Sequence, residues 1–506
     1  MVTLSARIED PMIQRSLGKK LRRRKRTWRL VWIGLLLLIA GAAIYGYLRF
    51  AEYGQVKVTQ LLEQGRQAET RFELTGALES YTQAIALGSV APEGAAEAAF
   101  RAAALFTGKS DHAQAQSHLL DAERLQPDVA LYSVALGRSY LSSRSIDPAE
   151  DAFDRALEAD TEYAPAYVGK ARVALAHLEA EPARLQTQKA LELAADNQEA
   201  QLLAAILLVH QDPSRSAELL RELRGSTKNK GYSATAAELQ EVLDRLTDTG
   251  GNLAYDYTLV GSVLLANNEL DGALLELTAA TDEDPEYRDG WVNRAQVHVL
   301  LGQLDEAQAA IETALKIDPT FGFSRFVQGQ VYQARGDLSR AQDAYERAIE
   351  QRYQEPQVYL VLADVLRQRT EDGSGGLTGS PSKAAVELLQ SAIDGDIRSD
   401  DLYDQLFWLY VEQDKPKQAL KIAQQYVIYD ERGTTAQGLL AFAQLTNGAE
   451  DQARETANDL VARDPLSAIG AYLIGTLDND PILLQKAIDL DQGGRIEELA
   501  RARLDS

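Results

Sequence analysis

Apolar residues recur along most of the chain at helical spacing, in pairs of short segments that repeat. In residues 130–160, Gly137 and Tyr140 fall on one face of a first amphipathic segment, and Ala149 and Phe153 fall on one face of a second. The same arrangement returns further along the chain. Because a spacing of three or four residues is the signature of an α-helix with one buried face, the pattern predicts successive pairs of packed helices.

Small residues mark both helices of each pair at a fixed interval of 34 residues. Two antiparallel helices approach closely only where the residues at their crossing are small, while a larger side chain fills the space beside them. A fixed period of this length is typical of repeat proteins. In the first helix the small residues are Ala103, Gly137, Ala171, Ala205, Gly261, Ala295, Gly329 and Ala363; in the second they are Ala115, Ala149, Ala183, Ala217, Ala273, Ala307, Ala341, Ala385, Ala419 and Ala453.

Prolines follow several of the second helices, where a fixed φ and a missing N–H end the helix. Together with the small residues and the aromatic residues beside them, this pattern resembles the tetratricopeptide repeat (TPR) over roughly residues 58–467, or about eleven units. The resemblance implies an all-α solenoid, a right-handed superhelix of antiparallel helix pairs that binds other proteins. The prolines are Pro127, Pro285, Pro319 and Pro465.

The repeat is interrupted twice. The first surplus contains a helical pattern from Ala234 to Leu246, and the second is a polar, glycine-rich loop. The unit that begins near residue 198 lacks the second-helix aromatic residue, which leaves its register open. The predicted organisation is a first TPR-like block at 58–225, an inserted helix or linker at 226–253, a second block at 254–467 with a loop insertion at 370–382, and capping helices at 468–506.

An uncharged stretch of 19 residues, Leu30 to Leu48, precedes the repeats. As a helix it would be roughly 28 Å long, close to the hydrocarbon thickness of a bilayer, about 30 Å. Tryptophan and tyrosine lie toward both of its ends, where such rings favour the membrane interface. We therefore expect a transmembrane signal-anchor helix over residues 28–50, which would contact the lipid bilayer.

Basic residues flank the N-terminal side of this stretch in the run KKLRRRKR. The positive-inside rule then places residues 1–27 in the cytoplasm and the bulk of the chain on the extracytoplasmic, periplasmic side of a bacterial cytoplasmic (inner) membrane. Two alternatives remain open at this stage. The sequence Ala40-Gly41-Ala42 resembles a signal-peptide cleavage site, and the bulk of the chain would be cytoplasmic if the topology were inverted.

The charge of the chain is divided unevenly. Residues 50–506 hold 41 basic and 73 acidic side chains, a net charge of −32. Because an acidic surface repels a phosphate backbone, nucleic acid is not an expected partner. The chain has no cysteine, which excludes disulfides and thiolate chemistry. The sequence does not indicate an oligomeric state.

The sequence shows no enzyme signature: there is no phosphate-binding glycine loop, no His-Glu-x-x-His and no nucleophile elbow. Its five histidines are scattered without ligand spacing. The acidic segment 282–290 lacks the glycine and the terminal bidentate acid of a calcium loop and coincides with a turn between repeats. We therefore expect no catalysis, no cofactor and no bound metal.

The TPR resemblance implies a concave groove, lined by the first helices, that holds a peptide or a partner helix. Read along this groove, the sequence is basic toward the anchor, where Arg66 also lies, and more apolar and aromatic beyond it. Each candidate also has an explanation that involves no partner: the arginines could simply be solvated, and the aromatic residues could pack in the core. The lysine, asparagine and arginine clamp of TPR co-chaperones is not reproduced. The candidate partner-binding residues are Arg138, Arg172, Tyr255, Phe323 and Phe326.

Two functions fit these features. The first is a membrane-tethered TPR scaffold or adaptor for protein–protein interactions in the assembly, secretion or quality control of envelope proteins. The second is a TPR component of a polysaccharide or polymer export system, in which exposed aromatic residues would contact sugars.

Overall fold

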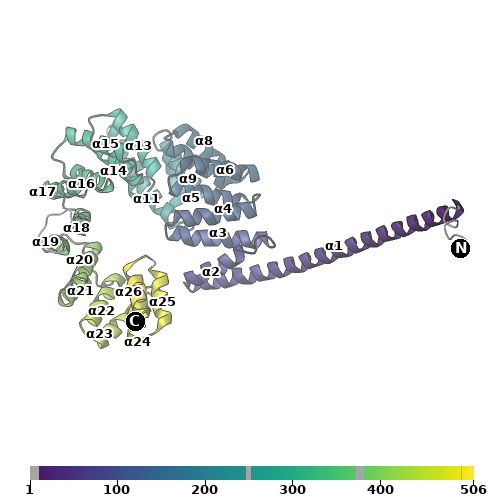
Figure 1. The fold of residues 1–506 in the computed structure, drawn as a ribbon. Helices are drawn as coiled ribbons and strands as arrows, with labels where there is room; N and C mark the ends of the chain where they lie inside the picture. Colours follow the sequence, from purple (N-terminus) through teal and green to yellow (C-terminus); the bar gives the residue numbers. More distant parts are fainter. Residues whose placement is uncertain (1–10, 247–251, 372–380, 492, 506) are drawn as a thin grey trace.

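The computed structural model describes residues 11–246, 252–371, 381–491 and 493–505. All regular structure in these residues is α-helical, with no β-strand among them. The helices wind into a nearly closed ring, and one long helix projects away from it (Figure 1). The expected all-α superhelix of helix pairs is therefore confirmed.

Successive helices pack as pairs, and the first helices of the pairs face the inside of the ring while the second helices form its outside (Figure 1). The first helices are α1 (Pro11–Thr70), α3 (Pro92–Gly108), α5 (Ala130–Ser142), α7 (Ala164–Ala176), α9 (Gln198–Leu208), α12 (Leu253–Ala266), α14 (Arg288–Leu300), α16 (Gly322–Ala334), α18 (Pro356–Glu371), α20 (Asp400–Glu412), α22 (Thr434–Thr446) and α24 (Ala468–Asp478). Their partners are α2 (Leu74–Ile85), α4 (His112–Leu125), α6 (Ile146–Ala159), α8 (Ala180–Leu193), α10 (Pro213–Arg224), α13 (Leu270–Glu283), α15 (Leu304–Ile317), α17 (Leu338–Glu350), α19 (Pro381–Asp394), α21 (Pro416–Tyr429), α23 (Glu450–Arg463) and α25 (Pro481–Leu490).

With the exception of Ala217, the small residues predicted at the helix crossings are buried, and large side chains of the second helices lie against several of them. A Cβ added to Gly137 would lie 2.7 Å from the ring of Phe153, and one added to Gly261 would lie 2.7 Å from Leu277. Both distances are far below ordinary van der Waals contact. The absence of a side chain at these positions is therefore what allows the two helices to meet.

A residue in the left-handed conformation stands in most of the turns between the two helices of a pair. This conformation carries a cost for residues other than glycine, and it recurs here because it reverses the chain within a few residues. In the central pairs the residues are Ser110, Arg144, Leu178, Asn268, Gly302, Gly336, Asp414 and Gly448, which are spaced by 34 positions within each uninterrupted group of repeats. Phe72 and Asn479 take the same conformation in the first and last pairs, outside this spacing.

The pair α9 and α10 departs from this geometry. Its two crossing residues are 11 positions apart instead of 12, because the buried small residue of α10 is Ser216, whose hydroxyl donates to the carbonyl of Ala205 at 2.8 Å. Ala217, the residue expected at this crossing, is only partly buried. The expectation is corrected by one position, because Asp212 caps α10 and starts the helix early relative to the other units.

Helix α11 (Lys230–Leu246) is an additional helix that packs against α9, α10 and α12. It falls within the segment 226–253, for which the sequence predicts an insertion, and it begins four residues before the expected Ala234. Beyond it the direction of the superhelix changes, and α13 packs against α7 of the first block.

The C-terminal helices bring the two ends of the solenoid together. Helix α26 (Arg495–Leu504) packs on α24 and α25. The hydroxyl of Thr75 on α2 donates to the Oδ1 atom of Asp489 on α25 at 3.2 Å, across 414 positions of sequence. This contact closes the ring (Figure 1). Most of the loop expected at 370–382, and residues 1–10 of the basic segment, lie outside the described residues.

Helix α1 joins the apolar N-terminal stretch to the first repeat without a break. Within the described residues it is the helix that is long and apolar enough to cross a membrane, a property that signal sequences share. Leu35 to Phe50 are exposed along it, whereas Val58 and Leu61 are buried against α2 and α3. The segment expected to span a membrane and the first helix of the repeats are thus one helix.

Candidate functional site

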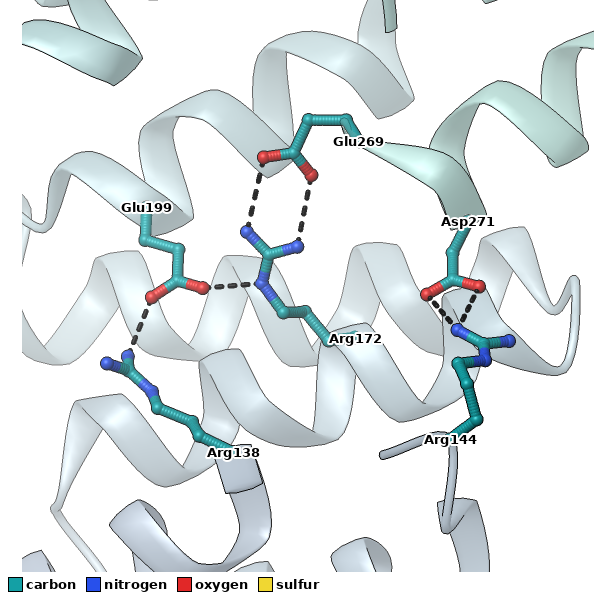
Figure 2. A network of polar contacts seen from close by, with 6 residues as sticks. All are labelled: Arg138, Arg144, Arg172, Glu199, Glu269 and Asp271. Atoms are coloured by element: carbon teal, nitrogen blue, oxygen red, sulfur yellow. Dashed lines mark hydrogen bonds and ion pairs between the residues drawn. The ribbon is translucent and has the colours of Figure 1, made fainter. Parts of the chain in front are cut away.

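The two arginines predicted in the groove of the first block lie on its inner face and share one carboxylate. Arg138 on α5 donates through Nη2 to Oε2 of Glu199 at 2.6 Å, and Arg172 on α7 donates through Nε to the other oxygen of Glu199. Glu199 belongs to the next first helix, α9. The two arginines therefore already hold an anion supplied by the chain itself (Figure 2).

The same network continues into the second block. Arg172 Nη1 donates to Glu269, which precedes α13, at 3.0 Å, and Arg144 Nη1 contacts both oxygens of Asp271 at 2.8 and 2.9 Å. Figure 2 shows these carboxylates reaching the arginines from the opposite side of a shared space. That space, a cavity of about 430 Å³, also receives Tyr232. The predicted basic groove is thus an ion-pair network that braces the turn of the superhelix.

The protonation of these groups follows from their partners. Burial alone would raise the pKa of Glu199, but the charges of Arg172 and Arg138 outweigh it and hold that pKa below its ordinary value. Burial would lower the pKa of Arg172, but Glu269 and Glu199 raise it further above its ordinary value. Both effects keep the network ionised.

Arginines close to α1 are neutralised in the same way. Arg66 pairs with Glu97 at 2.5 Å, and Arg101 pairs with Glu97 at 3.1 Å and with Glu69 at 3.4 Å. The expectation of a basic groove near the anchor is therefore corrected. Neighbouring first helices supply a carboxylate for each of these guanidinium groups. Comparing one equivalent position per repeat in the sequence does not reveal this pairing, because the partners stand at different positions of their repeats.

The aromatic candidates of the second block occupy two different depths. Phe326 on α16 is 2% exposed, and its ring stacks on Phe323 with centroids 6.2 Å apart and packs on Tyr345 at 5.8 Å. Phe323 is half-buried and also contacts Tyr353 at 5.4 Å. Phe326 therefore belongs to the core, and Phe323 lies above it with one side toward solvent.

Tyr255, the remaining candidate, stands in the first turn of α12 and is 41% exposed. Its backbone N–H donates to the side chain of Asn252, the N-cap of that helix, at 3.1 Å. It is one of the more exposed large side chains of the second block. The structure brings together Arg138 and Arg172, and separately Phe323 and Phe326, while Tyr255 belongs to neither group.

Phe323 lines a hollow of about 800 Å³ on the second block. The hollow extends across the N-terminal ends of three first helices, α16, α18 and α20. It is mainly apolar, with carboxylates among its lining residues. They are Phe321, Phe323, Tyr353, Glu355, Pro356, Gln357, Leu360, Ser399 and Asp401.

One buried polar cluster was not foreseen from the sequence. Nε2 of His210, in the short turn before α10, lies 2.8 Å from Oε2 of Glu276 on α13, and its ring packs on Tyr257 at 4.4 Å. Burial raises the pKa of Glu276, and the hydrogen bond with His210 opposes this only in part. Like the arginine network, the pair ties the end of the first block to α13.

Among the residues that the structure describes, no group of three or more histidine, aspartate or glutamate side chains is arranged to hold a metal ion. The carboxylates of Glu199, Glu269 and Asp271 are paired with arginine, and that of Glu276 is paired with histidine. What the inner face offers to a ligand is surface: the hollow on α16, α18 and α20, and the exposed ring of Tyr255.

Comparisons with known proteins agree with this geometry. Two family models, each described as tetratricopeptide repeat, match residues 264–322 and residues 108–164, 326–401 and 405–468, together about half of the chain. No curated protein sequence matches the chain.

The chain also resembles solved structures, each at low identity and with a TM-score below 0.5. The Cut9–Hcn1 hetero-tetramer of APC/C has 14% identity and a TM-score of 0.37, over 88% of this chain and 96% of that one. Yeast Tom70 has 14% identity and a TM-score of 0.34, over 81% and 96%. A tetratricopeptide repeat protein from Parabacteroides merdae has 16% identity and a TM-score of 0.26, over 54% and 98%.

Tetratricopeptide repeats are interaction modules, typically without catalytic function, that bind peptides or protein partners. The period, the packing of small residues at the helix crossings and the matching family models all lead to one assignment. The chain belongs to the tetratricopeptide repeat family.

Proposed function

We propose that this protein is a membrane-tethered scaffold that holds partner proteins next to a bacterial cytoplasmic membrane, in the assembly, secretion or quality control of envelope proteins. The observation that carries the proposal is the continuity of α1. The apolar stretch Leu35–Phe50 is exposed to its full length, and the same helix then becomes part of the first repeat. An exposed apolar helix of this length is costly in water and stable in a bilayer.

In this proposal residues 28–50 span the bilayer, residues 1–27 lie in the cytoplasm and the ring lies on the far side. The basic run before the span supports this orientation. The partner site lies on the inner face of the second block, around Phe323 and with Tyr255 nearer to the turn. Arg138 and Arg172 contribute indirectly, because they fix the shape of the inner face.

Two reporter fusions after Ser506 test the topology, one active only outside the cytoplasm and one active only inside. Activity of the outside reporter is expected. Activity of the inside reporter alone would place the ring in the cytoplasm and would overturn the orientation. The size of the mature chain on a gel reports cleavage near Ala42, which would remove the anchor.

The scaffold function is tested by crosslinking intact cells and isolating the protein from solubilised membranes. The control is the same anchor, residues 1–57, fused to an unrelated globular domain. We expect envelope or secretion proteins to be enriched over this control. Recovery of the same proteins with both baits would contradict a role for the repeats.

A role in polymer export is the second candidate, favoured by the exposed side chain of Tyr255 and the half-buried ring of Phe323. Aromatic faces stack on sugars as readily as on apolar peptide side chains. Isothermal titration with the organism's surface polysaccharide distinguishes the two: binding that is lost in Tyr255→Ala plus Phe323→Ala would favour export.

A further inference from the structure

The hollow on α16, α18 and α20 combines an aromatic floor with an acidic rim. Phe321, Phe323 and Tyr353 form the apolar part, and Glu355 and Asp401 stand exposed at its edge. In the part of the chain that the structure describes, no lysine or arginine is among the residues lining this hollow. Aromatic faces and carboxylates both attract cations, so the two halves of the surface favour the same kind of ligand.

The floor of the hollow is held rigid from below. Phe323 stacks on the buried Phe326, and Tyr353 packs on both rings at 5.4 and 5.1 Å. Tyr345 contacts Phe326 from the second helix of the pair at 5.8 Å. The ring of Phe323 is therefore fixed before a ligand arrives, which lowers the entropy lost on binding.

The positive partial charges at the N-terminal ends of the bordering helices do not cancel the negative charge of the rim. The N-termini of α18 and α20 each contribute roughly half a positive charge. Glu355 precedes α18, and Asp400 and Asp401 lie in the first turn of α20, where full negative charges outweigh that partial charge. The amide of Leu402 is already satisfied by the hydroxyl of Ser399 at 3.2 Å. The rim is acidic in sum.

The protein itself shows how a guanidinium group binds at the edge of this surface. The guanidinium carbon of Arg288 lies 3.6 Å from the ring centroid of Phe321. The same group bonds to Asp289 and Asp318 at 2.7 and 2.8 Å. An aromatic face beneath and carboxylates beside the cation are the elements that recur in the neighbouring hollow, where they face solvent.

We propose that the hollow binds a segment of a partner protein in which an arginine or lysine stands next to an apolar side chain. The apolar side chain enters between Phe323 and Leu360, and the cation lies over the ring of Tyr353 or Phe323 and pairs with Glu355 or Asp401. The assignment rests on the proposed function, since it names the chemistry of the partner that the scaffold holds. It also fits the charge of residues 50–506, −32, which steers cationic segments toward the ring.

The chain's own basic run does not reach the hollow within one molecule. Helix α1 carries that run away from the ring as one continuous helix (Figure 1). The cationic segment therefore comes from a separate polypeptide.

The test uses the full chain in lipid nanodiscs and fluorescence anisotropy of two labelled decapeptides. One alternates arginine and leucine, and the other alternates glutamate and leucine. The protein variants are Phe323→Ala and the pair Glu355→Gln with Asp401→Asn. The matched control is Glu312→Gln with Asp343→Asn, which neutralises two exposed carboxylates on the second helices α15 and α17.

We expect the arginine peptide to bind at least tenfold more tightly than the glutamate peptide. The rim variant, which neutralises two exposed carboxylates, should weaken it about five- to tenfold, since one exposed charge pair contributes up to about fivefold in affinity, and the control variant should not. Added salt should weaken binding to the wild type more than to the rim variant. Phe323→Ala should lose affinity for the arginine peptide while remaining folded. Phe323→Tyr, which keeps the aromatic ring, should retain that affinity.

Equal binding of the two peptides, or an unchanged dissociation constant in the rim variant, overturns the proposal. Displacement of the arginine peptide by a neutral oligosaccharide of six or more sugars also overturns it, in favour of a sugar ligand. The crosslinking experiment separates this result from the scaffold function. Partners recovered equally with wild type and Phe323→Ala leave the scaffold in place and reject this site, whereas partners absent altogether reject the scaffold.

Discussion

Arg172 and Glu269 stand 97 positions apart and meet through Nη1 and Oε2 at 3.0 Å, on opposite sides of the turn that α11 introduces. One belongs to the groove of the first block and the other to the start of α13. Their side chains are 27% and 14% exposed, so the pair is shielded from much of the screening that weakens surface ion pairs.

Arg172→Ala is expected to destabilise the protein by about 1.5 to 3 kcal/mol, since it leaves Glu269 without its charged donor and Glu199 with Arg138 alone. Urea unfolding of the solubilised protein measures this. Arg184→Ala is the control, because Arg184 pairs only with a neighbour on its own helix and is exposed. A double-mutant cycle with Glu269→Ala should show a coupling between the two sites. Additive effects would mean that the contact contributes nothing.

Lowering the pH is expected to weaken the stabilisation that this network provides. The pKa of Glu199 is lower in the folded protein than its ordinary value of 4.5. Its stabilising contribution is therefore complete above that value and is lost as the pH falls through the folded-state pKa. Glu199→Gln should be less stable than wild type at pH 7, and the difference should shrink below about pH 4.5. A difference that stays constant with pH would argue against an ionised Glu199 in the network.

Packing at the helix crossings gives a second test of stability. Gly137→Leu must displace the ring of Phe153, which lies 2.7 Å from the position of an added Cβ, and should cost about 1 to 3 kcal/mol. Gly108→Leu is the control, because an added Cβ there meets nothing within 4 Å. Thermal unfolding distinguishes the two. Equal melting temperatures would contradict the observed helix register.

The repeats could be predicted from the sequence because their cause is local. Gly137 and Phe153 are 16 positions apart, and the contact between them returns as Gly261 with Leu277. The pairing of Arg172 with Glu269 had no such signal, because it depends on the angle that α11 sets between the two blocks. Phe323 and Phe326 lie on the same helix only three positions apart. The different exposure of their side chains follows from the neighbouring Tyr345 and Tyr353. A comparison of equivalent positions in successive repeats does not locate these neighbours.

Closure of the ring can be measured directly, because the natural chain has no cysteine. Thr75→Cys with Asp489→Cys places two thiols where α2 meets α25, and mild oxidation should join them in a disulfide, which needs no reagent to enter the buried position 489. Thr75→Cys with Ile482→Cys, the latter exposed on the same helix α25, is the control. Equal linkage in both variants, or none in either, would show that the ring is open in solution.

Because α1 is continuous, the number of residues between its apolar stretch and the ring fixes the orientation of the ring about the helix axis. Each residue of an α-helix adds about 100° of rotation and 1.5 Å of rise. One alanine inserted after Glu52, an exposed position before the first buried residues, would therefore turn the ring by more than a quarter of a circle about the helix axis. Seven would return it to nearly its original direction, about 10 Å further along that axis. If the apolar stretch is held in a fixed orientation, the direction in which the hollow faces is also fixed. Partners then approach the hollow from one direction only.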